Sequence, residues 1–232
     1  MERKVSFVQG EFYHVYNRGV EKRTLFLGNY DYNRFIFLLH VLNTNENLKI
    51  RDLLREKSFE ELLKIKNEDP IVAIGAYCLM PNHFHLLLTP LVDGGISKFM
   101  LKLQTAYSMY FNIKNKRSGA FFQGAFKSQH LDTDEYLRYI YSYIHLNPAK
   151  LKDKNWRERG PKDFNSLKEF ILNYKYSSIR EYIEDDFIIT NPIHFSDFIK
   201  DYKSKKEYLE TMIDDWLNYK KEEITQGSPV FG

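Results

Sequence analysis

The chain has 232 residues, of which 43% are hydrophobic and 28% charged, and its formal net charge is +3. This is the composition of an ordinary globular protein, and the length suits one domain with an extension or two small domains. The longest apolar run, around residues 86–88, is far too short to cross a bilayer. The polar first residues also lack the apolar segment of a secretory signal. We therefore expect a cytoplasmic protein without a membrane partner, and the single Cys78 excludes an internal disulfide.

The beginning of the chain predicts a strand, a helix and a charged insertion. Residues 11–17 are rich in aromatic and β-branched side chains, which is typical of a strand. Residues 29–45 have apolar residues at helical spacing and predict a helix against one face of a sheet. Residues 46–70 mix charged residues with leucines, and we expect a helical insertion at the surface there.

The centre of the chain predicts a pair of neighbouring strands. Residues 71–79 and 83–89 are apolar runs separated by the turn sequence Met80-Pro81-Asn82. A connection this short requires the two strands to be antiparallel. Residues 96–114 then predict a long helix, and residues 120–131 a further strand.

A second helix is predicted over residues 134–147, with Asp132 as its cap and Glu135 three residues on. It should end before Pro148, because proline disfavours the helical conformation in the preceding residue. Residues 150–232 are more polar and predict a mostly helical extension. Helices that accompany an antiparallel strand pair indicate the α+β class.

Residues 94–131 contain no aspartate or glutamate. A cluster of lysine and arginine is typical of a surface that binds the phosphates of a polyanion, and the interleaved aromatic residues could stack on bases. The alternative is a chance excess in a lysine-rich chain. The predicted DNA contacts in this stretch are Lys98, Lys102, Lys114, Lys116, Arg117 and Lys127.

His83 and His85 are two residues apart in a predicted strand, so both imidazoles project from the same face. This geometry suits two ligands of one metal ion. The pattern is also compatible with a pair of surface or hydrogen-bonded histidines, and a nucleophile and a third ligand would have to come from elsewhere.

The helix over residues 134–147 is rich in tyrosine, and Tyr143 differs from the others because Asn147 lies one helical turn beyond it. A phenol and an amide oxygen can therefore point to one site, and an amide oxygen is an acceptable ligand for Mg²⁺ or Mn²⁺. Asn147 could instead be only the last residue of the helix. His145 points away from this face, which predicts packing or DNA contact rather than catalysis. Tyr107 and Tyr110 remain alternative nucleophiles.

Three segments together resemble the REP-associated tyrosine transposases, within the single-tyrosine HUH transposase superfamily. They are Met80-Pro81-Asn82-His83-Phe84-His85-Leu86-Leu87-Leu88, Phe122-Gln123-Gly124-Ala125-Phe126-Lys127-Ser128, and Asp134-Glu135-Tyr136-Leu137 leading to Tyr143-Ile144-His145-Leu146-Asn147-Pro148-Ala149. The resemblance implies a ferredoxin-like antiparallel sheet with helices packed on it. It also implies that His83 and His85 are metal ligands, that Tyr143 is the nucleophile and that Asn147 completes the metal site.

The expected function is that of a transposase which nicks and rejoins single-stranded DNA through a 5′-phosphotyrosine intermediate, with Mg²⁺ or Mn²⁺ as cofactor. The expected partner is single-stranded DNA that forms a hairpin, bound by a monomer or homodimer. We assign residues 1–149 to the catalytic domain and residues 150–232 to the helical extension. The alternatives are a non-catalytic protein that binds hairpin nucleic acid, and a metal-dependent hydrolase that uses water.

Overall fold

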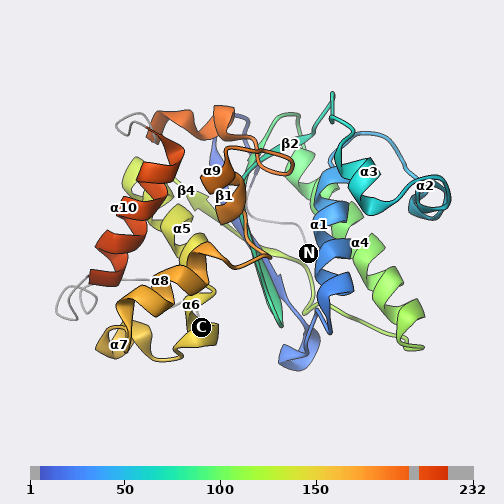
Figure 1. Ribbon diagram of the computed structural model, residues 1–232. Helices are drawn as coiled ribbons and strands as arrows, with labels where there is room; N and C mark the ends of the chain where they lie inside the picture. Colours follow the sequence, from blue (N-terminus) through green and yellow to red (C-terminus); the bar gives the residue numbers. More distant parts are fainter. Residues whose placement is uncertain (1–5, 199–203, 219–232) are drawn as a thin grey trace.

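The computed structural model describes residues 6–198 and 204–218. Its centre is a four-stranded sheet in the order β2-β3-β1-β4, in which every neighbouring pair is antiparallel. The strands are β1 (Phe12–Arg18), β2 (Val72–Met80), β3 (His83–Pro90) and β4 (Lys127–Leu131). Helices follow β1 and β3, so the chain order and the sheet order are those of the predicted ferredoxin-like fold, which is confirmed (Figure 1).

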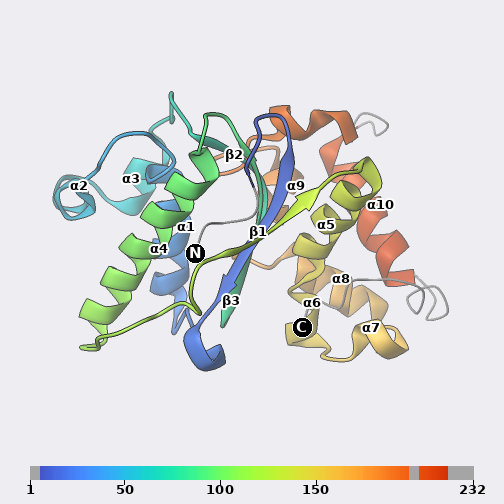
Figure 2. The ribbon, with the colours of Figure 1, turned by 180° about the vertical axis from the view of Figure 1, so that it is seen from behind.

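The first layer of helices covers one face of this sheet (Figure 2). It contains α1 (Asn29–Val41) and α4 (Gly95–Lys114), and the predicted insertion forms the short helices α2 (Ile50–Glu56) and α3 (Phe59–Leu63). Phe35 of α1 is fully buried against Phe84 of β3, and the fully buried Tyr107 of α4 packs on Phe35. Burial of the apolar stripes of α1 and α4 is thus what fixes this layer on the sheet.

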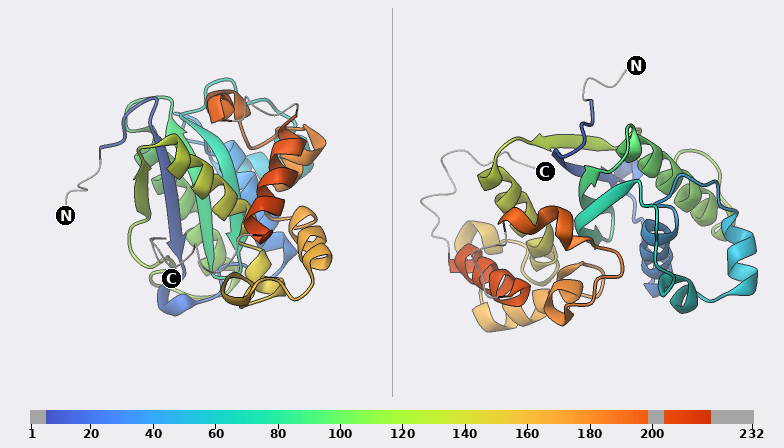
Figure 3. Two further views of the ribbon diagram at one scale, coloured as in Figure 1. Left: turned by 90° about the vertical axis from the view of Figure 1, so that its left-hand side faces the viewer. Right: turned by 90° about the horizontal axis from the view of Figure 1, so that it is seen from above.

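The second layer covers the opposite face and is built around α5 (Asp134–Leu146), which packs on β2 and β3 (Figure 3). Ile140 and Ile144 of α5 are fully buried in this core. The later helices pack around α5 and contribute to the same core. They are α6 (Ala149–Lys152), α7 (Trp156–Arg159), α8 (Phe164–Leu172), α9 (Ile179–Glu184), the 3-10 helix η2 (Pro192–Phe198) and α10 (Lys205–Asn218). A separate 3-10 helix, η1 (Val20–Lys22), follows β1.

Residues 176–178 run along the outer edge of β2. The Leu79 amide donates to the Tyr176 carbonyl at 2.9 Å, and the Ser178 amide donates to the Tyr77 carbonyl at 3.0 Å. The mostly helical character of the extension is therefore confirmed for its described residues, and the extension is also attached to the sheet. The predicted boundary after residue 149 separates segments that share one hydrophobic core.

The start and end of α5 differ in detail from the prediction. The cap is Thr133, whose hydroxyl accepts a hydrogen bond from the Tyr136 amide at 3.2 Å, so the choice of Asp132 was wrong by one residue. The helix ends at Leu146, but Asn147 still has helical angles (φ −55°, ψ −40°) in front of Pro148. Because α6 begins directly after this proline, the chain turns tightly rather than leaving the helical conformation.

The segment before β4 corrects two other expectations. Only residues 127–131 of the predicted strand over 120–131 form one, while Phe122 makes an isolated bridge to Gly19. Tyr107, Phe121 and Phe122 are buried in the first layer, so they cannot offer surfaces on which bases stack. Their aromatic area contributes to the core instead. Among the described residues, no helix has the length and apolar character needed to cross a membrane.

Candidate active site

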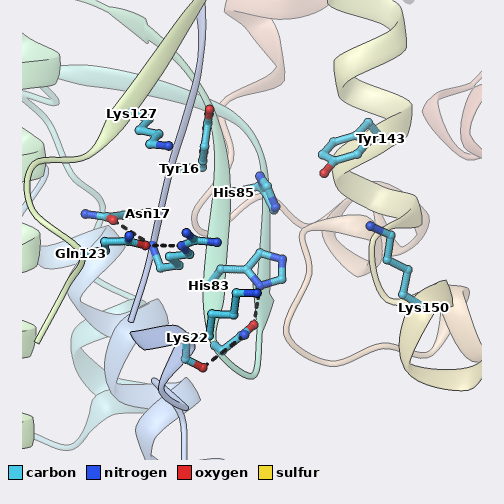
Figure 4. A pocket seen from close by; sticks show the side chains of 11 residues that line it. Tyr16, Asn17, Lys22, His83, His85, Gln123, Lys127, Tyr143 and Lys150 are labelled. Carbon is cyan, nitrogen blue, oxygen red and sulfur yellow. Dashed lines mark hydrogen bonds between the residues drawn. The ribbon is translucent and has the colours of Figure 1, made fainter. Parts of the chain in front are cut away.

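A pocket of about 440 Å³ lies where β1 and β3 face the end of α5 (Figure 4). Register places its residues there, because Tyr16 pairs with His85 and Arg18 pairs with His83 across β1 and β3. Directly paired residues in an antiparallel sheet present their side chains on the same face. The lining residues are Tyr16, Asn17, Arg18, Lys22, Asn82, His83, His85, Gln123, Lys127, Tyr143 and Lys150.

His83 begins β3 and is oriented by its neighbour. Its Nδ1 lies 2.6 Å from Asn82 Oδ1, and since an amide oxygen only accepts, Nδ1 carries the proton and Nε2 keeps its lone pair. Burial lowers the pKa of His83 to about 4, and the charges of Lys150 and Arg18 add to the effect. The ring is therefore neutral at pH 7 and has a nitrogen available to a cation.

His85 lies two residues further along β3, with its ring centre 5.0 Å from that of His83. Its Nδ1 is 2.9 Å from Nε2 of His14, a fully buried histidine of β1. Its Nε2 is buried and has no hydrogen-bond partner among the described residues. Burial holds the pKa of His85 well below its usual range, so this imidazole is neutral as well. Burial of a nitrogen without a hydrogen-bond partner costs free energy unless a ligand binds to it.

Tyr143 reaches the same space from α5. Its ring centre lies 5.4 Å from that of His85 and the two planes are almost perpendicular, at 89°. Burial raises the pKa of the Tyr143 phenol, while the charge of Arg157 and hydrogen bonds from Asn147 and Arg157 act in the opposite direction. The structure thus brings together three of the four predicted residues, namely His83, His85 and Tyr143, at one pocket.

Asn147, the fourth predicted residue, is buried one turn beyond Tyr143 and is not one of the lining residues. Its amide donates to the Tyr143 carbonyl at 3.1 Å. The described residues contain no cluster of three His, Cys, Asp or Glu side chains that could hold a metal. A cation at this pocket would thus have two imidazoles, with amide, water or phosphate oxygens as its other ligands. The unpartnered Nε2 of His85 fits such a ligand, and the role of Asn147 stays a prediction.

Four cations line the pocket together with the histidines, and no carboxylate from the described part of the chain does. Arg18 and Lys22 come from β1 and η1, Lys127 from β4, and Lys150 from α6. Figure 4 shows Lys127 and Lys150 on opposite sides of the histidine pair. A concave site lined by charge of one sign concentrates the field and attracts a ligand of opposite sign. The pocket is therefore suited to an anionic group such as a phosphate.

Of the six cations that were predicted to contact DNA, Lys127 lines this pocket and the others lie elsewhere. Lys98 and Lys102 donate to Asn45 and to the Thr44 carbonyl, and Lys114 forms an ion pair of 2.5 Å with buried Asp31. Lys116 and Arg117 follow the end of α4. Their contact with DNA stays a prediction, because these bonds do not require DNA and do not exclude it.

The alternative nucleophiles Tyr107 and Tyr110 are engaged away from the pocket. The hydroxyl of Tyr107 donates to the Leu25 carbonyl at 2.8 Å, and that of Tyr110 donates to Asp31 at 2.6 Å, both in the first layer. His145 is fully buried between the Tyr141 carbonyl and Ser178, which agrees with the predicted packing role. Tyr143 is the tyrosine of α5 that lines the pocket.

Several residues of the site were missed by sequence reasoning. His14, Tyr16 and Arg18 alternate along β1, so their spacing could have placed them on one face. Sequence alone did not indicate that this face adjoins the histidine pair. Arg157 was also missed; its guanidinium carbon lies 4.9 Å from the centre of the Tyr143 ring. The remaining missed residues of the pocket are Asn17, Lys22, Asn82, Gln123 and Lys150.

The sheet has a ferredoxin-like topology, with a histidine pair on β3 and a tyrosine on the helix across the same face, which is the arrangement that the family resemblance implied. Residues 36–147 match the family described as "Transposase IS200 like". The predicted relationship to this family is confirmed by that match, which covers slightly less than half of the chain.

No curated protein matches the chain. A solved structure described as "Structure of the REP associates tyrosine transposase bound to a REP hairpin" is similar with a TM-score of 0.48 and 13% sequence identity. The similarity covers 82% of this chain and 94% of that one.

Proposed function

We propose that this protein cleaves and rejoins single-stranded DNA through a covalent 5′-phosphotyrosine intermediate on Tyr143. The observation that carries the proposal is that Tyr143 and the His83–His85 pair line one pocket with four cations and, within residues 6–198 and 204–218, no carboxylate. Such a pocket suits a phosphodiester, and a hydroxyl beside it is placed as a nucleophile. The match to a transposase family supports the same reaction class.

In the proposed reaction, the phenolic oxygen of Tyr143 forms a bond to phosphorus while the bond between phosphorus and the 3′ oxygen breaks. The phenol loses its proton and the departing 3′ oxygen gains one, so neither water nor ATP is consumed. A 3′ hydroxyl that later attacks the phosphotyrosine rejoins a strand and restores the phenol. Because burial raises the pKa of Tyr143, its proton is still present at neutral pH and leaves during the attack.

We propose His83 and His85 as the ligands of Mg²⁺ or Mn²⁺, each through Nε2, with Asn147 as the third protein ligand. The lowered pKa values of both histidines support this assignment, because neutral imidazoles can donate lone pairs. The bound ion would supply stabilisation of charge on the phosphate oxygens. Lys127 and Lys150, on opposite sides of the histidine pair, are placed to hold the DNA backbone.

Two rival functions use the same pocket. A protein that only binds hairpin DNA would also benefit from the cations, but it would not require a tyrosine beside an unpartnered imidazole nitrogen. A hydrolase would activate water and leave no adduct on the protein. The proposed DNA is single-stranded and forms a hairpin, as the family resemblance implies.

Denaturing electrophoresis separates these functions. The protein is incubated with Mn²⁺ and a single-stranded hairpin DNA labelled on the 3′ side of the cleavage site, since this fragment stays on the tyrosine. We expect a labelled band at the mass of the protein plus DNA, and its loss after chelation with EDTA. Cleaved DNA without an adduct would favour the hydrolase, and bound but intact DNA would favour the binding protein.

A further inference from the structure

The segment that follows Pro148 brings two cations to Tyr143. Lys150 of α6 lines the pocket from the side of α5 (Figure 4). Arg157 of α7 lies over the Tyr143 ring, with its guanidinium carbon 4.9 Å from the ring centre. Both residues come after the part of the chain that matches the transposase family, residues 36–147. The nucleophile is thus contacted by an element that the family match does not include.

The surroundings of Arg157 are aromatic. Besides Tyr143, the guanidinium lies 5.5 Å from the ring centre of Trp156 and 5.9 Å from that of Trp216 on α10. Its Nε and Nη2 atoms are buried and have no hydrogen-bond acceptor among the described residues. Aromatic faces attract a cation, but they replace a carboxylate or water only in part. Burial of a guanidinium with unsatisfied N–H groups costs free energy, and its position beside the nucleophile indicates a role in the reaction.

Trp216 also connects the aromatic rings around Arg157 to α5, the helix that carries Tyr143. Its ring centre lies 5.1 Å from that of Tyr139, which precedes Tyr143 by one turn and stacks on it at 6.3 Å. The Tyr143 ring therefore has Tyr139 on one side and Arg157 on another. These contacts limit the rotation of the ring, whose hydroxyl has to lie in line with the bond that breaks.

We propose that the segment after Pro148 is part of the active site, in which Arg157 positions the Tyr143 ring and Lys150 binds the phosphate that Tyr143 attacks. The inference rests on the proposed cleavage by Tyr143. Arg157 acts through Tyr143 and is a positioning residue. Among the described residues, Lys150 has no such ring or ion-pair contact, and it lines the pocket directly, where it would touch DNA.

The two roles predict different effects, one on the rate of adduct formation and one on DNA affinity. Single-turnover kinetics measures the rate, and fluorescence anisotropy measures the affinity. Arg157→Met should slow adduct formation by about 100-fold and leave DNA affinity unchanged, since misplacement of a reacting group has this order of effect. Arg157→Lys should recover part of the rate, because it retains the charge. Lys150→Met should weaken DNA binding and reduce the slope of its salt dependence by about 1. Lys154→Met, an exposed change in the same segment, is the matched control and should alter neither quantity.

The outcomes also separate this inference from the function on which it rests. If the wild-type protein forms no adduct, the proposed function is wrong. If the wild type forms the adduct and Arg157→Met does so at the same rate, the positioning role is wrong while the function stands. If Lys150→Met binds DNA with the affinity and salt slope of the wild type, the proposed contact between Lys150 and the phosphate is wrong.

A loss of rate through misfolding is distinguished by chemical rescue. Arg157→Ala leaves a space between the rings that a free guanidinium ion can enter. Recovery of the adduct rate on addition of millimolar guanidinium, and not of an equal concentration of sodium, supports the positioning role. A folded Arg157→Ala protein, with a wild-type circular dichroism spectrum, that guanidinium fails to restore would overturn it.

Discussion

His14 and His85 are joined across β1 and β3 by a hydrogen bond of 2.9 Å between His14 Nε2 and His85 Nδ1. Both rings are buried, and their centres lie 5.0 Å apart. The bond occupies one nitrogen of His85, so the other nitrogen, Nε2, is the one available at the pocket. Histidines that ligate a metal are commonly held by such a contact through their second nitrogen.

The first prediction is that His14→Phe weakens metal binding. Phenylalanine keeps the ring volume but removes the bond that orients His85, and loss of such a contact lowers metal affinity by about 10- to 100-fold. Isothermal titration of the DNA-free protein with Mn²⁺ measures the effect. Tyr13→Phe, which removes only a hydroxyl from the neighbouring position of β1 and lies in the core on the other face of the sheet, is the control. Equal Mn²⁺ affinities for wild type and His14→Phe would show that His85 needs no such support.

The second prediction is that Tyr143→Phe abolishes the covalent adduct and retains DNA binding. The change removes only the phenolic oxygen, and loss of its hydrogen bonds should cost stability by about 1 kcal/mol. Tyr139→Phe is the matched control, because Tyr139 lies on the same helix and is half-buried against Trp216. An adduct that persists in Tyr143→Phe would move the nucleophile to another residue.

The third prediction concerns the pocket cations. Lys127→Met should weaken the binding of single-stranded DNA and lower the slope of log affinity against log salt by about 1, since each phosphate contact releases counterions. Lys64→Met, an exposed change next to α3, should leave the slope unchanged. Binding isotherms over a range of NaCl concentrations give both slopes. If the two variants lose the same affinity, the effect is one of net charge and the pocket has no special role.

The fourth prediction is a loss of stability in weak acid that originates at His145. Burial lowers the pKa of His145 from 6.5 to about 3 in the folded chain. Below pH 6.5 the unfolded chain therefore takes up a proton that the folded chain does not, so the free energy of unfolding falls with pH until about pH 3. One such histidine contributes a slope of about 1.4 kcal/mol per pH unit.

Urea unfolding at pH 7.5 and pH 5.5 tests this dependence. His145→Gln should be less stable than wild type at pH 7.5, because the bonds to Tyr141 and Ser178 are disturbed. Its stability should nevertheless change less between the two pH values. The same pH dependence in both proteins would assign the acid sensitivity to other groups, of which His14, with a pKa lowered to about 3 by burial, is the first candidate.

The histidine pair could be predicted because strand periodicity is a local property. His83 and His85 share a face whatever the partner strand is, and the turn at Pro81-Asn82 fixes the β2–β3 pairing. Tyr143 followed in the same way from helical spacing and from the family motif. The His14 contact could not be predicted, because it depends on the register of β1 against a strand about 70 residues away in sequence.

Arg157 shows a second limit of sequence reasoning. Nothing in the spacing between Arg157 and Tyr143 indicates contact, since Pro148 and the short helix α6 lie between α5 and α7, the helix that carries Arg157. The contact results from the packing of Trp156 and the other apolar residues of the extension into the core around α5. The basic run over residues 94–131 shows a related limit, because its charge predicts a surface but not the internal contacts of Lys102 with the Thr44 carbonyl and of Lys114 with Asp31.

The segment along β2 has a consequence for association. An uncovered outer strand offers its peptide groups to the sheet of another molecule, which is a common origin of aggregation. Residues 176–178 satisfy those groups at Tyr77 and Leu79, so β2 is closed to such pairing. The opposite outer strand, β4, is five residues long and begins with Lys127, and short strands with lysine disfavour growth of the sheet. The protein can therefore keep its cationic pocket open without exposing a long, unpaired sheet edge to its own copies.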